Sequence, residues 1–448
     1  MVTEKAFPLL FYKKKLIFSF LIRGALFFLF MLPAAFADTL LDVVKHTLQT
    51  NPTALSSKAA YEASLQNLKK AQADYFPTLD LTVNAGREYS DTPTLRGSGI
   101  DGTTLTPREK KLTLSERLYT GGAVSNQVSQ RRAQVEAARE DLDSTLENVA
   151  LQAIKVYIDV LRNQALVAVS QDNVSIQESI ARKINLRVSH GLSPRVDAEL
   201  SQSRLSQSRV DLINAQNQKE IADANFLQVT GLQAKMLDLP HPPTKKIPGS
   251  MISALLLAEK KSPTIYAAKQ KVDAAYSAVQ VSKAPFYPKL DLQLSINRAN
   301  DLSGSAGYNI DKKAMLDLTY NLFKGGADIA QYKYDVQQLY QAKDALNDER
   351  RKLDREVDVA WVNYISDESR VTETKLYAKL SKETLTGYGK EFDIGRRSLF
   401  DLLNAEGDYH NAQTRQTNAK FDYVQDVYTI LAKIGILVNT LTVETLHG

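Results

Sequence analysis

The sequence of 448 residues contains no cysteine and only five histidines, and each shortage excludes a class of function. Without cysteine, the chain forms no disulfide, holds no thiolate-bound metal, has no catalytic thiol and carries no lipid on an N-terminal cysteine. The histidines are scattered along the chain and lack the spacing of metal ligands. The sequence also shows no Ser/His/Asp arrangement and no phosphate-binding loop. We therefore expect no cofactor, no metal and no enzyme activity.

Long apolar segments are missing after residue 37. Residues 24–32 form a short apolar run that follows four basic residues and precedes Ala35-Phe36-Ala37, which fits a signal-peptide cleavage site. A transmembrane anchor is the alternative, but the run is shorter than the roughly 20 residues that a spanning helix needs. We predict a signal peptide over residues 1–37, and any later membrane crossing must then use strands.

An excess of one charge is missing as well, once the signal peptide is set aside. Residues 1–37 hold five of the 56 basic residues and one of the 51 acidic residues. The remaining 51 basic and 50 acidic residues leave a net charge of about +1. Nothing in this balance suggests a nucleic-acid partner.

The chain does contain a duplication. The sequence "LYTGGA" at 118–123 returns as "LFKGGA" at 322–327, 204 positions later. The sequence "DYFPTLDL" at 74–81 returns as "PFYPKLDL" at 285–292, 211 positions later. The offset changes by seven residues between these landmarks, which indicates a variable loop there. We divide the chain after the signal peptide into repeat 1, residues 38–245, and repeat 2, residues 246–448.

Each repeat is predicted to be a long helical hairpin. Residues 122–188 contain no proline, and their apolar residues recur every seven positions, which is coiled-coil spacing. This predicts a helix of about 66 residues and roughly 100 Å, with a second one at 326–392. A returning helix of about 35 residues and an opening helix of about 24 should stack end to end along it. The connector 231–250 holds four prolines and should join the repeats away from both hairpin tips.

A β-hairpin is predicted at the far end of each helical hairpin. Apolar and polar residues alternate strictly over 79–86 and again over 290–297. A soluble hairpin with one face on a core would look the same. Two hairpins give four strands per chain, and closed membrane barrels have at least eight. If the strands span a bilayer, several chains must therefore share one barrel.

In this pattern the chain resembles the TolC family of outer-membrane channel proteins. The resemblance covers essentially all of the chain after the signal peptide. It rests on "NP" at 51–52, matched by "SP" at 262–263, before a helix, and on three motifs present in both repeats: "(Y/F)-P-x-L" before a strand, "L-(Y/F)-x-G-G" at a strand end and the G-x5-D turns. The resemblance implies a mainly α-helical homotrimer with a 12-stranded outer-membrane β-barrel above a periplasmic α-helical barrel. It also implies a closed iris of helix tips, opened by an inner-membrane transporter and a periplasmic adaptor.

The resemblance also assigns roles to residues of "IGRRSLFDLLNAE" at 394–406. Asp401 matches an acidic ring at the narrowest point, and Asn404 stands where the family often has a second aspartate. Arg397 matches a basic residue that ties this tip to the first-repeat turn, where Asp197 is the corresponding partner. Phe392 stands where an aromatic hydroxyl often makes a further tie, which a phenyl ring cannot make. The turn residues expected near the adaptor are Gly191, Leu192, Ser193, Gly395, Arg396 and Ser398.

Two alternatives remain open from the sequence. Ser398 and Asp401 also fit a capping box, and Ser193-Pro194 fits an ordinary helix start. For the whole chain, we expect the exit duct of a type I protein secretion system, driven by an ABC transporter. An efflux duct for small molecules, served by a proton-driven pump, is the alternative, and a soluble periplasmic coiled-coil protein is the rival of another class.

Overall fold

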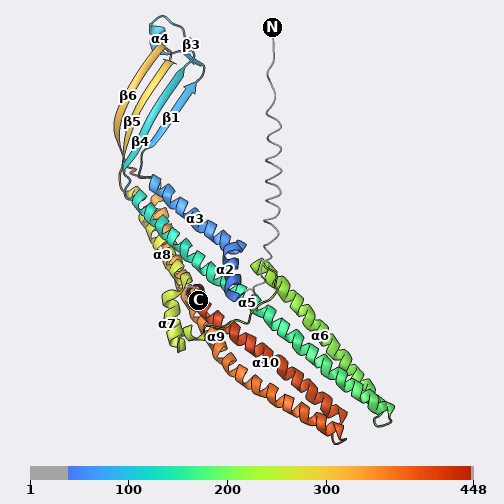
Figure 1. Cartoon of the computed structure of the whole chain (residues 1–448). Helices are drawn as coiled ribbons and strands as arrows, with labels where there is room; N and C mark the ends of the chain where they lie inside the picture. Colours follow the sequence, from blue (N-terminus) through green and yellow to red (C-terminus); the bar gives the residue numbers. More distant parts are fainter. Residues whose placement is uncertain (1–38, 445–448) are drawn as a thin grey trace, which may run out of the picture.

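The computed structural model describes residues 39–444, so the predicted signal peptide lies outside the described residues. Two long helical hairpins run side by side, and a sheet rises from their upper end (Figure 1). In chain order the helices and strands are α2 (Leu40–Thr50), α3 (Pro52–Ala73), β1 (Thr78–Ala85), β2 (Glu88–Ser90), α4 (Pro93–Gly97), β3 (Thr103–Leu105), β4 (Arg108–Tyr119), α5 (Ala123–Ser189), α6 (Arg195–Thr230), η1 (Thr244–Lys246), α7 (Met251–Lys261), α8 (Pro263–Val281), η2 (Ala284–Phe286), β5 (Lys289–Leu302), β6 (Ser305–Thr319), α9 (Ala327–Asp393), α10 (Leu399–Ile434) and α11 (Leu437–Glu444).

The helices confirm the duplication. Both long helices, α5 and α9, have 67 residues, and both returning helices, α6 and α10, have 36. Each long helix is therefore about 100 Å long. No helix within residues 39–444 combines the length and the apolarity needed to cross a membrane. The domain boundary between residues 245 and 246 stays a prediction.

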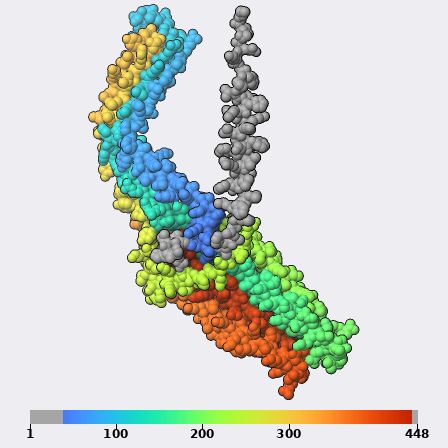
Figure 2. All heavy atoms as spheres, in the orientation of Figure 1, coloured from blue at the N-terminus to red at the C-terminus, as the bar shows by residue number. Residues whose placement is uncertain are grey.

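Short helices lie along the long ones, as their lengths predicted. In Figure 1, α3 follows the upper part of α5 and α6 follows its lower part. Helix α10 runs back along the lower part of α9, and α8 packs against the upper parts of both α5 and α9. The two hairpins thus share their upper half and present two tips at the lower end of the molecule (Figure 2).

One antiparallel sheet joins the two repeats. Its strand order is β1-β4-β5-β6, so the two predicted hairpins pair through their inner strands β4 and β5. Leu114 lies opposite Leu294, and Leu79 lies opposite Leu114 on the other side. The apolar residues of successive strands therefore form rows on one face of the sheet. Strands β1 and β6 are its edges, and the leucines of β6 are well exposed, with Leu318 at 69%.

The main core lies midway along the helices, at the level where the connector crosses. Its fully buried members come from α2, α5, α6, α10 and α11, and include Tyr157, Phe226, Tyr428 and Val43. Leucines of the connector pack against this core, and the Tyr157 hydroxyl donates a hydrogen bond of 2.7 Å to the carbonyl of Asp238. The connector is thus fixed at the middle of the molecule, away from both tips, as predicted.

Candidate functional site at the two helix tips

The two tips share one backbone plan. The first tip, residues 190–194, joins α5 to α6, and the second tip, residues 394–398, joins α9 to α10. Gly191 and Gly395 have φ of 70° and 75°, a conformation that residues with a side chain rarely adopt. The amide after each glycine donates to a carbonyl five residues back, at 2.8 Å in the first tip and 2.9 Å in the second. This is the Schellman motif, which satisfies the last carbonyls of the long helices.

The second tip is fixed further by a side-chain cap. Ser398 is the N-cap of α10, and its Oγ accepts a hydrogen bond of 3.1 Å from the amide of Asp401. The same hydroxyl donates to Asp401 Oδ2 at 2.8 Å. The serine half of the capping box is therefore present, and the Asp401 carboxylate binds the serine hydroxyl at the positive end of the α10 dipole.

Arg397 is engaged within the second tip. Its Nε and Nη2 atoms lie 2.9 and 2.8 Å from Oε2 of Glu391, and its guanidinium lies 4.0 Å from the ring centroid of Tyr388. Its Nη1 is also 4.0 Å from Asp401 Oδ2. Hydrogen bonding to Glu391 raises the pKa of Arg397 above its usual value, so this side chain stays charged. The repulsion expected between the helix dipole and Arg397 is offset by these two carboxylates.

The structure does not bring Arg397 and Asp197 together within one chain. Within residues 39–444, the Asp197 side chain makes no hydrogen bond or ion pair. The first tip has Pro194 as its N-cap, so Ser193 does not cap α6. Leu192 and Val196 are exposed at 68% and 63%, so the first tip presents apolar side chains that the chain itself does not cover.

Phe392 joins the two hairpins without a hydroxyl group. Its ring is 5% exposed and lies under the guanidinium of Arg187, at 4.9 Å from the ring centroid. Arg187 Nη1 also donates to the Phe392 carbonyl at 3.4 Å. One turn earlier on α5, Lys183 Nζ lies 2.6 Å from Oδ1 of Asp393. The end of α5 is thus tied to the end of α9 by a cation–π contact and an ion pair.

An apolar cluster lies directly behind these contacts. We call it the tip cluster, and its buried members are Ile180, Ile184, Phe392, Leu399, Leu402 and Leu403. Helix α10 turns this face toward α5 and leaves the opposite face outward. Asp401 is half-buried and Asn404 is exposed, so both lie away from the tip cluster. Arg396 is exposed beside them. The first turns of α10 can therefore present Asp401 and Asn404 to a space outside the single chain.

The sequence reasoning missed Arg187, Lys183 and Glu391. A signal was available, because Arg187 and Glu391 are equivalent positions in the two repeats, 204 residues apart. Opposite charges at equivalent positions beside both glycine turns indicate that the two tips make different contacts. Lys183 and Arg187 are four residues apart in the last turns of α5, and basic residues there are also typical of a helix C-terminus.

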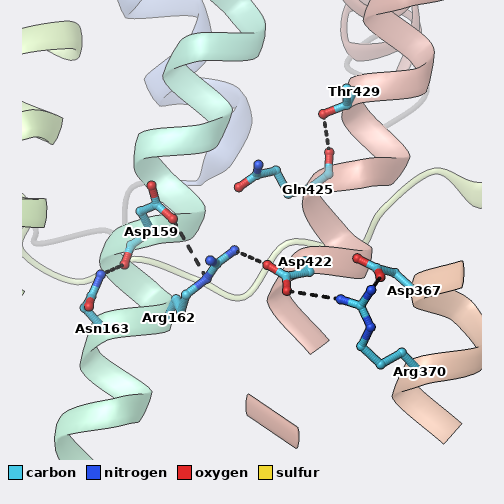
Figure 3. Close-up of polar contacts among 8 residues, drawn as sticks. All are labelled: Asp159, Arg162, Asn163, Asp367, Arg370, Asp422, Gln425 and Thr429. Atoms are coloured by element: carbon cyan, nitrogen blue, oxygen red, sulfur yellow. Dashed lines mark hydrogen bonds and ion pairs between the residues drawn. The ribbon is translucent and has the colours of Figure 1, made fainter. Parts of the chain in front are cut away.

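A second set of polar contacts joins the hairpins midway along their length. We call it the waist network; its members are Asp159 and Arg162 on α5, Asp367 and Arg370 on α9, and Asp422 on α10. In Figure 3, Arg162 reaches from α5 to Asp422, with Nη2 at 2.9 Å from Oδ1. Arg370 pairs with Asp367 at 2.9 Å and lies 3.9 Å from the other oxygen of Asp422. Asp422 therefore connects all three helices.

The waist network holds more acidic than basic groups. Burial and the neighbouring carboxylate of Asp367 together raise the pKa of Asp426, one turn along α10, to about 7. Burial likewise raises the pKa of Asp159, while Arg162 lowers it. Asp426 therefore holds a proton near neutral pH, because like charges in a half-buried site oppose full ionisation.

The comparisons with known proteins identify this architecture. A family model described as outer membrane efflux protein matches residues 43–232 and 254–435. The chain belongs to the outer membrane efflux protein family. The family and its fold are those of channel proteins, and they place the chain in the outer membrane with its helices in the periplasm. A soluble periplasmic coiled-coil protein, the rival expectation, does not fit this family.

Relatives and solved structures cover nearly the whole chain. The outer membrane efflux protein BepC of Brucella suis is 24% identical over 90% of this chain and 86% of its own length. The alkaline protease secretion protein AprF of Pseudomonas aeruginosa is also 24% identical, over 89% of this chain and 84% of its own. The CmeC outer membrane channel of Campylobacter jejuni superposes with a TM-score of 0.78 at 16% identity, over 89% of this chain and 86% of that one. The expected TolC-like fold is confirmed.

Proposed function

We propose that this chain is the exit duct of a type I protein secretion system. The observation that carries the proposal is the pair of tips at the end of two hairpins, which present uncovered apolar and acidic side chains. The second tip, with "EFDIGRRSLFDLLNAE", resembles family members that serve type I secretion, and the chain has no cysteine for lipid attachment. A relative named for alkaline protease secretion supports this class. A relative named for pyoverdine export supports the alternative, a duct for small molecules.

Three copies would complete the duct. The single chain has a four-stranded sheet with two unpaired edges, which lipid does not tolerate. Three copies would supply twelve strands and close the sheet on itself. The same symmetry would bring three Asp401 carboxylates together at the lower end. The wall is passive in this proposal, and the inner-membrane transporter and the adaptor provide the driving force and the opening.

The tips would carry both the constriction and the adaptor contact. Three Asp401 side chains form a ring of three negative charges that favours a bound cation, and Asn404 adds none. Arg397 has donors beyond those used by Glu391, so it can also reach Asp197 of a neighbouring copy as a gate tie. The exposed turn residues, led by Leu192 and Arg396, are then the surface for the adaptor.

Complementation tests the proposed cargo class. The full chain is expressed in a Gram-negative strain that lacks its own channels of this family, together with a type I transporter and adaptor or with a drug efflux pump and adaptor. We expect the exported protein to appear in the medium in the first case. Restored drug resistance without protein export would instead establish the small-molecule alternative.

Conductance tests the proposed constriction. Trimers in planar bilayers should be cation-selective and blocked by polyvalent cations, and the Asp401→Ala variant should lose most of that block. A variant that is blocked as readily as the wild type would remove Asp401 from the constriction.

A further inference from the structure

A buried carboxyl joins the two hairpins just above the tip cluster. Glu406, in the second turn of α10, is 2% exposed, and Gln177 of α5 donates a hydrogen bond from Nε2 to its Oε2. Gln177 is 4% exposed, and Asn173, one turn earlier on the same face of α5, is 6% exposed. This contact spans from the hairpin of the first tip to the hairpin of the second tip.

The polar atoms of this layer are not all satisfied. Oε1 of Glu406, Oε1 of Gln177 and Oδ1 of Asn173 are buried and have no hydrogen-bond partner among the described residues. All three are acceptors when Glu406 is ionised, so the layer has more acceptors than donors. A buried carboxylate oxygen without a donor is costly, whereas the neutral acid carries less charge and supplies one donor. The packed arrangement therefore favours the protonated form of Glu406.

We propose that Glu406 is a proton-dependent latch that holds α10 against α5 when it is protonated and weakens that contact when it ionises. The proposal rests on the proposed opening of the duct at its tips. Separation of the two hairpins at this level would expose the carboxyl to water, where its ionised form is stable.

The surrounding charges agree with this direction. Burial raises the pKa of Glu406 to about 7, while Gln177 and the charge of Arg204 on α6 lower it. Arg204 is exposed, so solvent screens it. His410 lies one turn further along α10, and burial lowers its pKa while Asp211 on α6 raises it. His410 therefore ionises on the acid side of neutral, and among the described residues no group of α9 acts on Glu406.

The sign of the effect follows from the two states. Glu406 has a pKa of about 7 when packed and the ordinary value of 4.5 when exposed. The stabilisation of the closed contact is complete below pH 4.5 and is lost as the pH rises through 7. Between pH 6 and pH 8, the ratio of closed to open tips should fall by about tenfold for each protomer.

Two variants with buried neutral isosteres test the latch. Glu406→Gln should remain closed and lose the pH response between 6 and 8. Glu147→Gln is the matched control, because Glu147 is also buried, at 7%, and its pKa is also raised to about 7 by burial. Glu147 accepts hydrogen bonds from the amides of Leu437 and Val438, at 3.1 and 3.2 Å, 30 residues before Gln177 on α5. The Glu147→Gln variant should keep the wild-type pH response.

The readouts are basal conductance of the reconstituted trimer and amide exchange, corrected for the chemical rate, in residues 173–181 and 402–410. We expect both to rise with pH in the wild type and in Glu147→Gln, and to stay flat in Glu406→Gln. Equal responses of Glu406→Gln and wild type, or a wild type without any response in exchange, would overturn the latch. Conductance that is absent at every pH counts against the proposed duct alone, since the exchange experiment still decides the latch.

Discussion

The first and second tips have the same backbone and different side-chain contacts. Both turn at a glycine with positive φ and both close with a Schellman motif. The second tip then adds a serine cap, an arginine held by Glu391 and a buried face of α10. The first tip adds a proline at the N-cap and leaves Leu192 and Val196 exposed. The second tip also leaves apolar side chains exposed, Ile394 at 66% and Phe400 at 59%. Duplication thus supplied the hairpin, and substitution gave the second tip internal ties that the first tip lacks.

The largest expected effect comes from loss of the phenyl ring of Phe392, which joins the two tips. Phe392→Ala removes a side chain that is 5% exposed from the tip cluster and from under Arg187. Truncation of a buried phenylalanine costs about 3–5 kcal/mol, so amide exchange at the ends of α5 and α9 should accelerate strongly. Phe421→Ala is the control, since Phe421 is equally buried in the main core, and it should leave exchange at the tips unchanged. Similar exchange at the tips in both variants would contradict the joining role of Phe392.

Arg397→Ala should have the next largest effect, on leakage. The variant frees Glu391 and Asp401 from their shared cation and removes the proposed tie to Asp197. We expect basal conductance and entry of large antibiotics to rise several-fold. Arg195→Ala at the first tip is the control, because that side chain is 88% exposed and pairs only with Glu199 at 3.3 Å among the described residues. Unchanged leakage in Arg397→Ala would place Arg397 in the adaptor contact instead.

A smaller effect is expected from removing the serine hydroxyl at the start of each returning helix. Ser398→Ala removes the hydrogen bond to the Asp401 amide and should cost about 1 kcal/mol in the first turn of α10. Ser193→Ala should cost nothing measurable, because Ser193 is not the N-cap of α6. Amide exchange in the first turn of α6 and in the first turn of α10 measures the two effects. A comparable loss in the two variants would show that the tips are fixed in the same way.

The smallest effect should come from added charge at the constriction. Asn404→Asp places a second carboxylate one turn after Asp401 on the outward face of α10. Polyvalent cations should then block conductance at about half the concentration that the wild type needs, because the ring gains charge. Glu199→Gln, an exposed change at the first tip, should leave the block unaltered. A block that does not tighten would mean that Asn404 does not face the conducting path.

The sequence was sufficient for the two helical hairpins and the two β-hairpins. It was insufficient for short elements such as α2, α7 and α11 and for the contacts between the tips. Heptad spacing, proline positions and the glycine landmarks predicted both long helices to within one residue of their observed length of 67. These signals are local, and each long helix is specified by its own period. The ion pair between Arg397 and Glu391 is not predicted by such a period. Glu391 lies six residues before Arg397 and meets it only because the glycine turn folds the chain back.

The layer around Glu406 was also hidden in the sequence. A glutamate three residues after an apolar pair fits either face of a helix, and the rotation of α10 against α5 decides that it is buried. Gln177 lies 229 positions earlier, so no local pattern links the two residues. For the tips, the alignment of the repeats carried a signal, since it sets Arg187 against Glu391.

The uninterrupted length of α5 makes it a lever. From Arg162 in the waist network to Ser189 at its end lie 27 residues, or about 40 Å of helix. If the waist network acts as the pivot, a tilt of about 5° moves the end of the helix by about 3.5 Å. No helix then needs to bend or unwind. In the proposed opening, a force applied at the tips would act on the ion pairs of the waist network with an arm of about 40 Å.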